Sequence, residues 1–471
     1  MFFSGIKYKR FYFSLLAKSR LGFFLFLLLI AFSVSGQSFR KGPYLIYPGI
    51  PSEMTILWQT TSSSTCQIFW GTTTQYLDGT ETPTESGTGN NEHQYIFTLE
   101  NLQPDIRYFY RVICGNDTSI ASFYSALPDT ATQSKFLVFG DTRSHPEDME
   151  LVSAAMLSEI ENDSLYQHLL IHSGDFNSND AESTWDEQFF NRAYPNNLSI
   201  QSQIPIVGVR GNHEGTAIQY NKYWPFPYLN TGAYYSFDYG PMHIAVVDEY
   251  TDFTAGSAQL IWLENDLANS TKTWKFISLH GPGYTDESLH HNNTDVQDFI
   301  QPLCIQYNVK VVFSGHNHFY AHCLVDGVHH LTLGGGGAPL YTTNHIGEGL
   351  LLSESNFHFA EVNLTGDSLI IRALRLDGSV IDSLTLTNLV DAITPLSKHD
   401  EVKIIIIDKM MNISGLTGVS SIRIRDINGK TFYSGKINSS LSQVDVSTYP
   451  VGVYIVSISG EKSINKKVVV H

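Results

Sequence analysis

Five short motifs between residues 140 and 318 place metal-ligand side chains beside glycines. They offer two Asp, one Asn and three His as candidate ligands, a mixed set of oxygen and nitrogen donors. Such a set suits the borderline ions Zn, Mn and Fe better than Ca or Mg. The motifs are Gly140-Asp141-Thr142-Arg143, Gly174-Asp175-Phe176-Asn177, Gly211-Asn212-His213-Glu214, Leu279-His280-Gly281 and Gly315-His316-Asn317-His318.

An apolar run typical of a buried strand precedes each motif. Residues 204–209, for example, are mostly β-branched and lead into Gly211. The runs alternate with stretches of helical spacing, which predicts a largely parallel sheet with helices outside it. Such sheets keep their chemistry at the carboxyl ends of the strands, so we expect the motifs to lie at strand tips. His316 and His318 would face the same side of a strand.

The predicted strands of this region cover residues 136–139, 169–171, 204–209, 274–279 and 309–313, with a hairpin over 234–247. Helices are predicted at 149–160, 257–268 and 296–307. The run Gly334-Gly335-Gly336-Gly337 lacks the Gly-Lys-Ser/Thr that would follow in a phosphate loop. We therefore expect it to be, at most, a close-approach loop near the site.

The regions on either side of the motifs have all-β character. Residues 38–130 contain short alternating strands at 54–58, 65–70, 95–99 and 107–112. Leu102 and Pro104 ahead of Tyr108 and Tyr110 suggest a tyrosine-corner sandwich of the immunoglobulin or fibronectin type III kind. After a polar linker at 391–400, residues 401–471 read as a small β-sandwich with strands at 404–407, 421–424, 444–446 and 453–456.

The 471 residues should divide into about three domains, and 42% apolar residues are enough for packed cores. The formal net charge is −17, and removing residues 1–36, which carry five basic residues and no acid, would leave −22. A chain this acidic is not expected to bind nucleic acid or an anionic membrane. A phosphate-bearing substrate would need local positive charge from a metal or an Arg.

Residues 1–36 fit a secretory signal peptide, because basic residues precede twelve apolar or Gly residues and a small-residue cleavage site. Twelve residues fall short of the roughly 20 that span a bilayer, so no stable transmembrane segment is expected after signal removal. In an oxidising compartment, Cys66 with Cys114 and Cys304 with Cys323 are plausible disulfides. Buried free thiols are an equal alternative.

The order of the five motifs resembles that of the calcineurin-like metallophosphoesterases, which implies a four-layer αββα fold with two packed sheets. Ser257-Ala258-Gln259-Leu260, Trp262-Leu263 and the N-terminal sandwich are most similar to the purple acid phosphatase branch. Residues 449–456 and the Lys-Lys-Val-Val-Val-His terminus resemble the C-terminal sorting domain of bacterial type IX secretion. The implied division is a signal peptide (1–36), a fibronectin type III-like domain (38–130), a phosphoesterase domain (131–390), a linker (391–400) and a sorting domain (401–471).

The resemblance also implies roles for single residues, with two transition-metal ions (Fe, Zn or Mn) as cofactors. Asp175 would bridge the ions and His213, a non-ligand, would act as general acid toward the leaving group. A hydroxide between the ions would attack phosphorus. The first ion would be held by Asp141 and His318, and the second by Asn212, His280 and His316.

Two positions depart from the family pattern. Arg143 stands where calcineurin-like enzymes carry a His, and Ser178 where purple acid phosphatases carry a Tyr. The first ion therefore keeps three identifiable protein ligands, unless Asn177 or water fills the gap. Arg143 would either contact the substrate phosphate or pair with Asp141.

Seven further histidines are not expected to be metal ligands. We assign surface or loop roles to His290, His291, His329 and His330, positions near the site to His322 and His345, and packing beneath a strand tip to His172.

The leading function is a secreted or cell-surface phosphomonoesterase that acts on a phosphate ester and is delivered by the type IX machinery. A phosphodiesterase is the nearest alternative, because specificity lies in loops such as residues 220–231. A non-catalytic surface binding protein with a degenerate metal site is the second, with Arg143 and Ser178 as its support.

Overall fold

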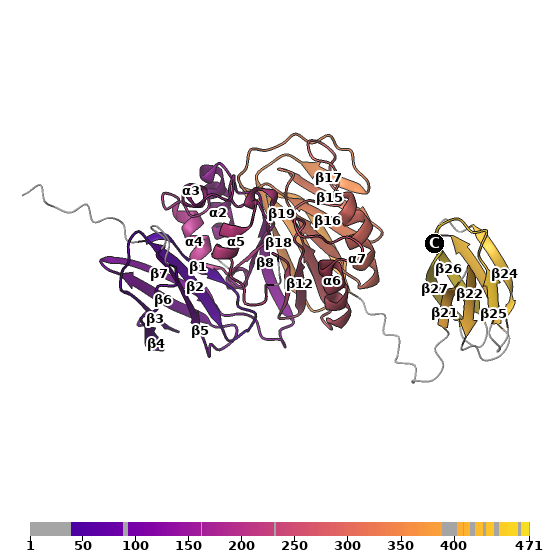
Figure 1. Cartoon of the computed structure of the whole chain (residues 1–471), viewed down its shortest axis with the longest axis horizontal. Helices are drawn as coiled ribbons and strands as arrows, with labels where there is room; N and C mark the ends of the chain where they lie inside the picture. The colour runs from indigo at the N-terminus through magenta and orange to yellow at the C-terminus, as the bar shows by residue number, and fades with distance from the viewer. Residues whose placement is uncertain are drawn as a thin grey trace, which may run out of the picture. The chain divides into compact units, whose positions relative to one another are not determined.

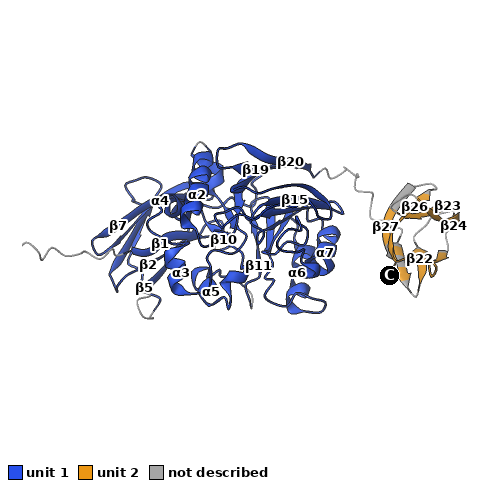
Figure 2. Cartoon of the chain, turned by 90° about the horizontal axis from the view of Figure 1, so that it is seen from above, with its two compact units in different colours: residues 1–388 blue, residues 389–471 orange. Residues whose placement is uncertain are grey.

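The computed structural model describes residues 39–87, 93–161, 163–229, 232–388, 403–407, 409–414, 420–426, 430–437, 442–459 and 463–470. The chain divides into two compact units, residues 1–388 and 389–471 (Figure 2). The expected signal peptide and the expected linker at 391–400 lie outside the described residues. Among the residues that are described, no helix is both long and apolar enough to cross a membrane.

Two antiparallel sheets form the N-terminal part of the first unit (Figure 1). One has the order β1-β2-β5: β1 Phe39–Ile46, β2 Met54–Thr60 and β5 His93–Leu99. The other has the order β4-β3-β6-β7: β4 Gly79–Glu81, β3 Cys66–Gly71, β6 Arg107–Cys114 and β7 Asp117–Tyr124. The hydroxyl of Tyr108 accepts a hydrogen bond from the backbone N–H of Gln103 at 3.0 Å, the contact expected at a tyrosine corner.

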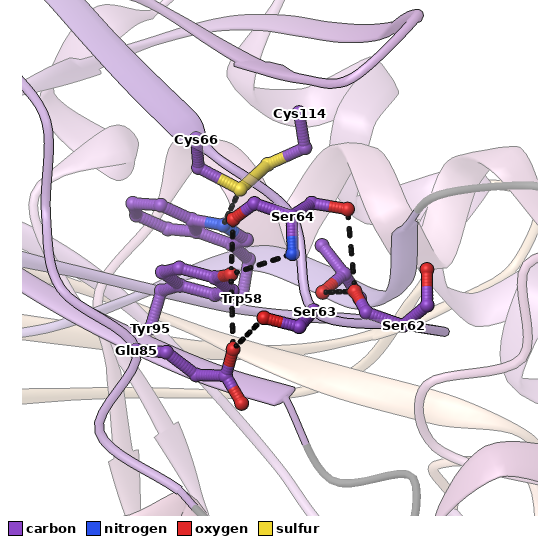
Figure 3. Close-up of a disulfide and its surroundings, with 9 residues drawn as sticks. Trp58, Ser62, Ser63, Ser64, Cys66, Glu85, Tyr95 and Cys114 are labelled. Atoms are coloured by element: carbon purple, nitrogen blue, oxygen red, sulfur yellow. Dashed lines mark hydrogen bonds between the residues drawn. A yellow bond between two sulfur atoms is a disulfide. The ribbon is translucent and has the colours of Figure 1, made fainter.

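A disulfide joins Cys66 to Cys114, which face each other across β3 and β6 (Figure 3). The indole N–H of Trp58 lies 3.5 Å from the sulfur of Cys66, and its ring stacks on Tyr95. The first predicted disulfide is therefore present. The second is not: Cys304 and Cys323 are buried free thiols, which was the alternative reading.

The central part of the first unit contains a six-stranded and a seven-stranded sheet. The six-stranded order is β10 Ile206–Gly208, β9 Leu170–His172, β8 Gln133–Phe139, β18 His358–Thr365, β19 Ser368–Arg375 and β20 Val380–Thr387. The seven-stranded order is β11 Tyr235–Tyr239, β12 Met242–Val246, β13 Trp274–Ser278, β14 Val311–Ser314, β16 Val328–Leu333, β15 Tyr320–Val325 and β17 Leu350–Glu354.

Both sheets are mixed. Within each sheet, the strands that precede the five motifs run parallel to one another, as predicted: β8, β9 and β10 in one sheet, β13 and β14 in the other. The later strands β18, β19 and β20 are antiparallel, so "largely parallel" holds only for the part that carries the motifs.

Aromatic side chains pack the two sheets against each other. The ring of Phe136 on β8 meets Phe276 on β13 and Phe313 on β14 edge-on, with centroids 5.7 and 6.2 Å apart. All three side chains are buried in one continuous core. The sheet edges where the motifs emerge are thereby held together.

Helices flank the sheets (Figure 1). They are α2 Pro146–Ile160, α3 Glu182–Glu187, α4 Pro195–Gln203, α5 Ile218–Tyr223, α6 Ala258–Asn269 and α7 Gln301–Gln306, with 3₁₀ turns at Ser164–Gln167 and Asn212–Glu214. The side chain of Ser257 caps α6 by accepting from the N–H of Leu260. The predicted helix at 296–307 begins as a π-helical turn, Val296–Ile300, and continues as α7.

The second unit has a three-stranded and a four-stranded sheet around its own apolar core, which includes Met411, Ile422 and Tyr454. The three strands are β21 Lys403–Ile407, β22 Met410–Ser414 and β25 Ser442–Asp445. The four strands are β24 Thr431–Ile437, β23 Ser420–Asp426, β26 Gly452–Ser459 and β27 Ser463–Val470.

Candidate metal centre

The candidate ligands follow the ends of strands from both sheets. Asp141 and Asp175 follow β8 and β9, and His280 and His316 follow β13 and β14. Asp141, Asp175 and His316 have left-handed backbone, with φ of 59°, 58° and 67°. Non-glycine residues seldom adopt this conformation, and where they do they concentrate at functional sites.

Four donor atoms converge in what we call the second ligand set: Asp175, Asn212, His280 and His316. The Oδ1 atom of Asn212 lies 3.1 Å from both Nε2 of His280 and Nδ1 of His316. These two nitrogens are 3.2 Å apart, and Nε2 of His280 is 3.4 Å from Oδ1 of Asp175. Two oxygens and two imidazole nitrogens at such separations fit a borderline divalent ion.

The first ligand set consists of Asp141, Asp175 and His318, whose ligand atoms lie within 4.8 Å of one another. Nε2 of His318 is 3.6 Å from Oδ1 of Asp141. Arg143 enters the same space. Its Nε lies 3.3 Å from Oδ2 of Asp175, and its Nη2 lies 3.3 Å from Nε2 of His318. Arg143 thus pairs with Asp175 and not, as one prediction held, with Asp141.

Backbone carbonyls fix which imidazole nitrogen faces the site. Nδ1 of His280 lies 2.9 Å from the carbonyl of Ser173, and Nδ1 of His318 lies 2.7 Å from that of Pro339. A carbonyl accepts only from a protonated nitrogen, so Nδ1 carries the hydrogen in both rings. Their Nε2 atoms therefore face the ligand sets, and in a neutral ring Nε2 carries the lone pair.

Burial and neighbouring charges set the protonation of the centre. Burial lowers the pKa of His316 to about 3, assisted by the positive charge of His280, and burial likewise lowers that of His318 to about 3. Burial alone would lower the pKa of His280, but Asp175 and Asp141 outweigh it and raise the value to about 10. His316 and His318 are therefore neutral near pH 7, with lone pairs available for a cation.

Glu214 ties two of the motifs together. Its buried carboxylate accepts hydrogen bonds from the backbone N–H groups of Gly211 at 2.7 Å, Asp175 at 3.0 Å and Phe176 at 2.9 Å. The turn that carries Asn212 is thereby fastened to the turn that carries Asp175. Such buried hydrogen bonds orient the ligands that touch an ion.

Glycines stand where the turns crowd together. A Cβ on Gly211 would lie 2.3 Å from Oδ1 of Asp175, and one on Gly334 would lie 2.2 Å from the carbonyl of Asn317. The glycine run at 334–337 is therefore the close-approach loop that its composition predicted.

His213 stands beside the ligands at the edge of the cavity. Its Nδ1 donates to the carbonyl of Ser178 at 2.7 Å, and its Nε2 lies 3.7 Å from Oδ2 of Asp175. Its side chain is 27% exposed. Ser178 contributes this carbonyl, while its hydroxyl is hydrogen-bonded to Gln188 at the periphery.

A cavity of about 250 Å³ opens over the centre. It is lined by Arg143, Asp175, Asn212, His213, Leu289, His290, His316 and Tyr341. Three of these were not assigned to the site from the sequence: Leu289, His290 and Tyr341. His290 packs on His316 with centroids 4.1 Å apart, and Tyr341 stacks on His318 at 4.0 Å. The Tyr341 hydroxyl accepts from Nη2 of Arg143 at 3.3 Å.

Several predictions for the remaining residues were wrong. His316 and His318 lie in a turn after β14, not in a strand. His290 lies in a loop, one of the two roles predicted for it, but it lines the cavity; His330, given the same prediction, is buried on β16 against Tyr284. His322, expected near the site, pairs instead with Asp382 at 2.7 Å.

The other assignments have mixed outcomes. His172 packs on Phe176 as predicted, and His291 is exposed. His329 lies on β16, with Nδ1 2.8 Å from Nε2 of His322, and His345 hydrogen-bonds Ser353. None of His322, His329 and His345 is among the cavity-lining residues.

Two suggested contributors to the site face elsewhere. The buried amide of Asn177 lies against Thr184, in the direction of α3, and so does not fill the gap in the first ligand set. Tyr220, Tyr223 and Trp224, from the predicted specificity loop, are buried in the core.

Three stretches of the chain match known family models. Residues 134–320 match the calcineurin-like phosphoesterases, residues 41–126 the N-terminal domain of purple acid phosphatases, and residues 403–471 a secretion-system C-terminal sorting domain.

Curated relatives give the same picture. The chain is 28% identical over 300 residues to the probable purple acid phosphatase 20 of Arabidopsis thaliana, covering 57% of this chain and 66% of that protein. It is 30% identical over 236 residues to purple acid phosphatase 22 of the same plant, covering 46% and 51%. It is 25% identical over 335 residues to the human acid phosphatase type 7, covering 62% and 74%. The matched region thus spans about half to two thirds of these two plant proteins.

The fold has a solved counterpart. A purple acid phosphatase from yellow lupin (Lupinus luteus) seeds superimposes with a TM-score of 0.61 at 18% identity, covering 74% of each chain.

Proposed function

Since the chain carries a calcineurin-like phosphoesterase domain behind a purple acid phosphatase N-terminal domain, and ends in a type IX secretion sorting domain, we propose that it is an exported metal-dependent phosphatase that cleaves phosphomonoesters. One observation carries the proposal. Six ligand-type side chains that follow strands of the two sheets form two adjoining groups that share Asp175, with separations suited to metal ions, and three of the six, Asp175, Asn212 and His316, line the cavity.

Two transition-metal ions of unassigned identity would be held by the two ligand sets, which share Asp175. When bound, they would neutralise charge on the phosphoryl oxygens and activate water for attack on phosphorus. The donor atoms of the second ligand set suit a transition-metal ion. Those of the first set suit one only in part, because Arg143 contacts two of its three members.

His213 would supply the proton that the departing alkoxide needs. Its Nδ1 is engaged by the Ser178 carbonyl, so the nitrogen that can exchange a proton in the cavity is Nε2. That nitrogen lies 3.7 Å from Oδ2 of Asp175. A protonated Nε2 at the cavity edge can donate to a leaving-group oxygen.

The cavity wall supports a small monoester as substrate. Leu289 is 60% exposed at this wall, with His290 and Tyr341 beside it. Arg143 is the only Lys or Arg among the lining residues of this described cavity, and it is already paired with Asp175. A single phosphate on a compact or aromatic alcohol suits this wall better than a polyphosphate, which would need more cations.

The test is to compare 4-nitrophenyl phosphate with bis(4-nitrophenyl) phosphate on the metal-loaded full chain. We expect kcat/KM for the monoester to exceed that for the diester by at least about tenfold, roughly 1.4 kcal/mol of transition-state discrimination. A preference for the diester would assign the site to phosphodiester cleavage. Hydrolysis of neither ester, together with no bound transition metal, would favour a non-catalytic binding protein.

Three finer structural statements belong to the same proposal. They are the four-layer αββα order of the central domain, a fibronectin type III-like N-terminal domain and a C-terminal β-sandwich. The domain boundaries at 38–130, 131–390 and 401–471 stay predictions, as do the signal peptide over 1–36 and the cell-surface or extracellular location.

A further inference from the structure

The guanidinium of Arg143 contacts two atoms that would also be metal ligands. Nε faces Oδ2 of Asp175 at 3.3 Å, and Nη2 faces Nε2 of His318 at 3.3 Å. The side chain is only 19% exposed. The Tyr341 hydroxyl, 3.3 Å from Nη2, holds the group from the cavity side.

Both contacts involve atoms of the first ligand set: Nη2 donates to the lone pair of His318 Nε2, and Nε forms an ion pair with Asp175. His318 has no other nitrogen to give, because its Nδ1 donates to the Pro339 carbonyl. Asp175 directs its other oxygen, Oδ1, to the second set, 3.4 Å from Nε2 of His280, and to the backbone N–H of His213 at 3.0 Å. The guanidinium thus engages the first-set side of Asp175 and not the second-set side.

Arginine cannot yield these positions by losing its proton, since its pKa lies above about 12 in proteins. An ion held by Asp141, Asp175 and His318 would need donor atoms at roughly 2.0–2.2 Å. The His318 lone pair cannot serve the guanidinium and an ion at once, and an ion beside Asp175 would repel the guanidinium charge. In the described centre no Lys or Arg contacts the second ligand set: Oδ1 of Asn212 lies against His280 and His316, and Oδ1 of Asp175 lies against His280 and the N–H of His213.

We propose that Arg143 is an internal competitor for the first ligand set, so that the two sites load unequally. The second set, Asp175, Asn212, His280 and His316, takes the first ion. The first set takes an ion only when the guanidinium leaves Asp175 and His318. This inference rests on the proposed two-ion function, and it makes Arg143 the residue that sets the metal stoichiometry.

The experiment is calorimetric titration of the metal-free full chain with Mn²⁺ alone, without substrate. The wild type should bind one equivalent tightly and a second at least tenfold more weakly. Arg143→Ala should bring the two dissociation constants to within about threefold of each other. Arg143→Gln, which keeps most of the side-chain volume, should do the same if the alanine variant melts early.

Further variants identify which ligand set holds each ion. In the wild-type background, His316→Ala should abolish the tightly bound Mn²⁺. In the Arg143→Ala background, His318→Ala should abolish the second Mn²⁺, whose binding the arginine substitution had strengthened. Arg375→Ala is the matched control: it also deletes an Arg–carboxylate pair, with Glu354 at 2.6 Å, but Arg375 is not among the residues that line the cavity. Its isotherm should equal that of the wild type.

Three results would overturn the inference: two equally tight ions in the wild type, an unchanged isotherm in both Arg143 variants, or loss of the tight ion in His318→Ala and not in His316→Ala. The failure of the proposed function looks different, because a chain that binds no Mn²⁺ at either site would contradict the phosphatase itself.

Discussion

Asp175 is the residue on which both ligand sets depend, because its two oxygens face different partners. Oδ1 lies 3.4 Å from His280, and Oδ2 lies 3.3 Å from Arg143. Its left-handed backbone, with φ of 58°, aims the carboxylate between the two sets. Cationic neighbours, His280 first among them, outweigh burial and lower the pKa of Asp175, so the carboxylate is charged across the neutral range.

The ligands could be predicted from the sequence because each is a polar residue beside glycine at the end of an apolar run. Tyr341 and His290 could not, since they reach the cavity from loops with no such pattern. Tyr341 lies four residues beyond the glycine run, and only the folded chain brings it onto His318. The partner of Arg143 was also undetermined by sequence, because Asp141 and Asp175 both follow buried strands.

At the residue scale, we predict that His213→Ala separates catalysis from metal binding. The side chain stands 3.7 Å from Asp175 but has no atom in either ligand set, so metal content should stay at the wild-type level. Turnover of an alkyl phosphate should fall about 100-fold or more through loss of the general acid. Turnover of 4-nitrophenyl phosphate should fall less, because its leaving group needs no proton.

Asn212→Ala is the matched control for this comparison. Asn212 lies next to His213 in the same turn, but its Oδ1 faces two histidine ligands. This variant should lose metal and activity together, as measured by elemental analysis and steady-state kinetics. Equal metal loss in both variants would make His213 a ligand and remove its acid role.

The 3₁₀ turn Asn212–Glu214 is the element that positions Asn212 in the second ligand set. Its carboxylate, Glu214, fastens it to the turn after β9. The sequence predicted the strands before such turns but missed the geometry of the turns themselves. His316 and His318 show the reason: tertiary hydrogen bonds, including those from the N–H of His316 to Asp141, bend the chain where a strand pattern would continue.

At the element scale, we predict that Gly211→Ala disables the centre. The added methyl would stand 2.3 Å from Oδ1 of Asp175 and 2.5 Å from its backbone nitrogen. One turn must move, at a cost of about 1–3 kcal/mol in unfolding free energy, and bound metal should fall. Gly452→Ala, whose methyl would meet nothing closer than 4.0 Å, should change neither quantity. Full metal content in Gly211→Ala would contradict the tight packing of the two turns.

The contact between β12 and α6 should make stability depend on pH. His243 is buried between Asp238 at 2.8 Å and Asp266 at 2.7 Å. Burial alone would lower its pKa, but the two carboxylates raise it to about 9. Its unfolded value is about 6.5, so the stabilisation is complete below about pH 6.5 and is lost as the pH rises through 9.

His243→Asn measures this effect. The variant should melt at a lower temperature than the wild type at pH 6, which is below the unfolded pKa of His243. The difference in melting temperature should shrink toward pH 10, which is above its folded pKa. Thermal melts across this range check the prediction. A gap that is constant with pH would show that His243 contributes packing and not charge.

At the scale of the whole molecule, the two units are built on separate cores. Within the first unit, Lys41 on β1 is fully buried and pairs with Glu182 on α3 at 2.6 Å, so the N-terminal sheets are joined to the central domain. The N-terminal β-region, the central region that carries the motifs and the C-terminal β-region could be predicted from composition and strand pattern. The antiparallel pair β11 and β12 matches the predicted hairpin at 234–247. The other antiparallel strands of the central sheets, β15 and β17 to β20, arrive after the last motif, and their direction could not be predicted.

We therefore predict that a chain ending at Asn388 keeps its enzymatic properties. It retains both ligand sets, the cavity and its own core, so kcat on 4-nitrophenyl phosphate and metal content should match those of the full chain. The same truncation in the native host should leave the protein inside the cell envelope, since the sorting domain is gone. A large loss of activity after truncation would mean that the second unit completes the site.

The ligands come from two sheets, with Asp141, Asp175 and Asn212 following strands of one and His280, His316 and His318 following strands of the other. Any cation bound between them also fastens the halves of the domain to each other. Binding to the folded form alone adds stability that grows with the free ion, about 2.7 kcal/mol at one hundred times the dissociation constant. Under the proposed export, the lifetime of this protein would then follow the trace-metal supply of its surroundings.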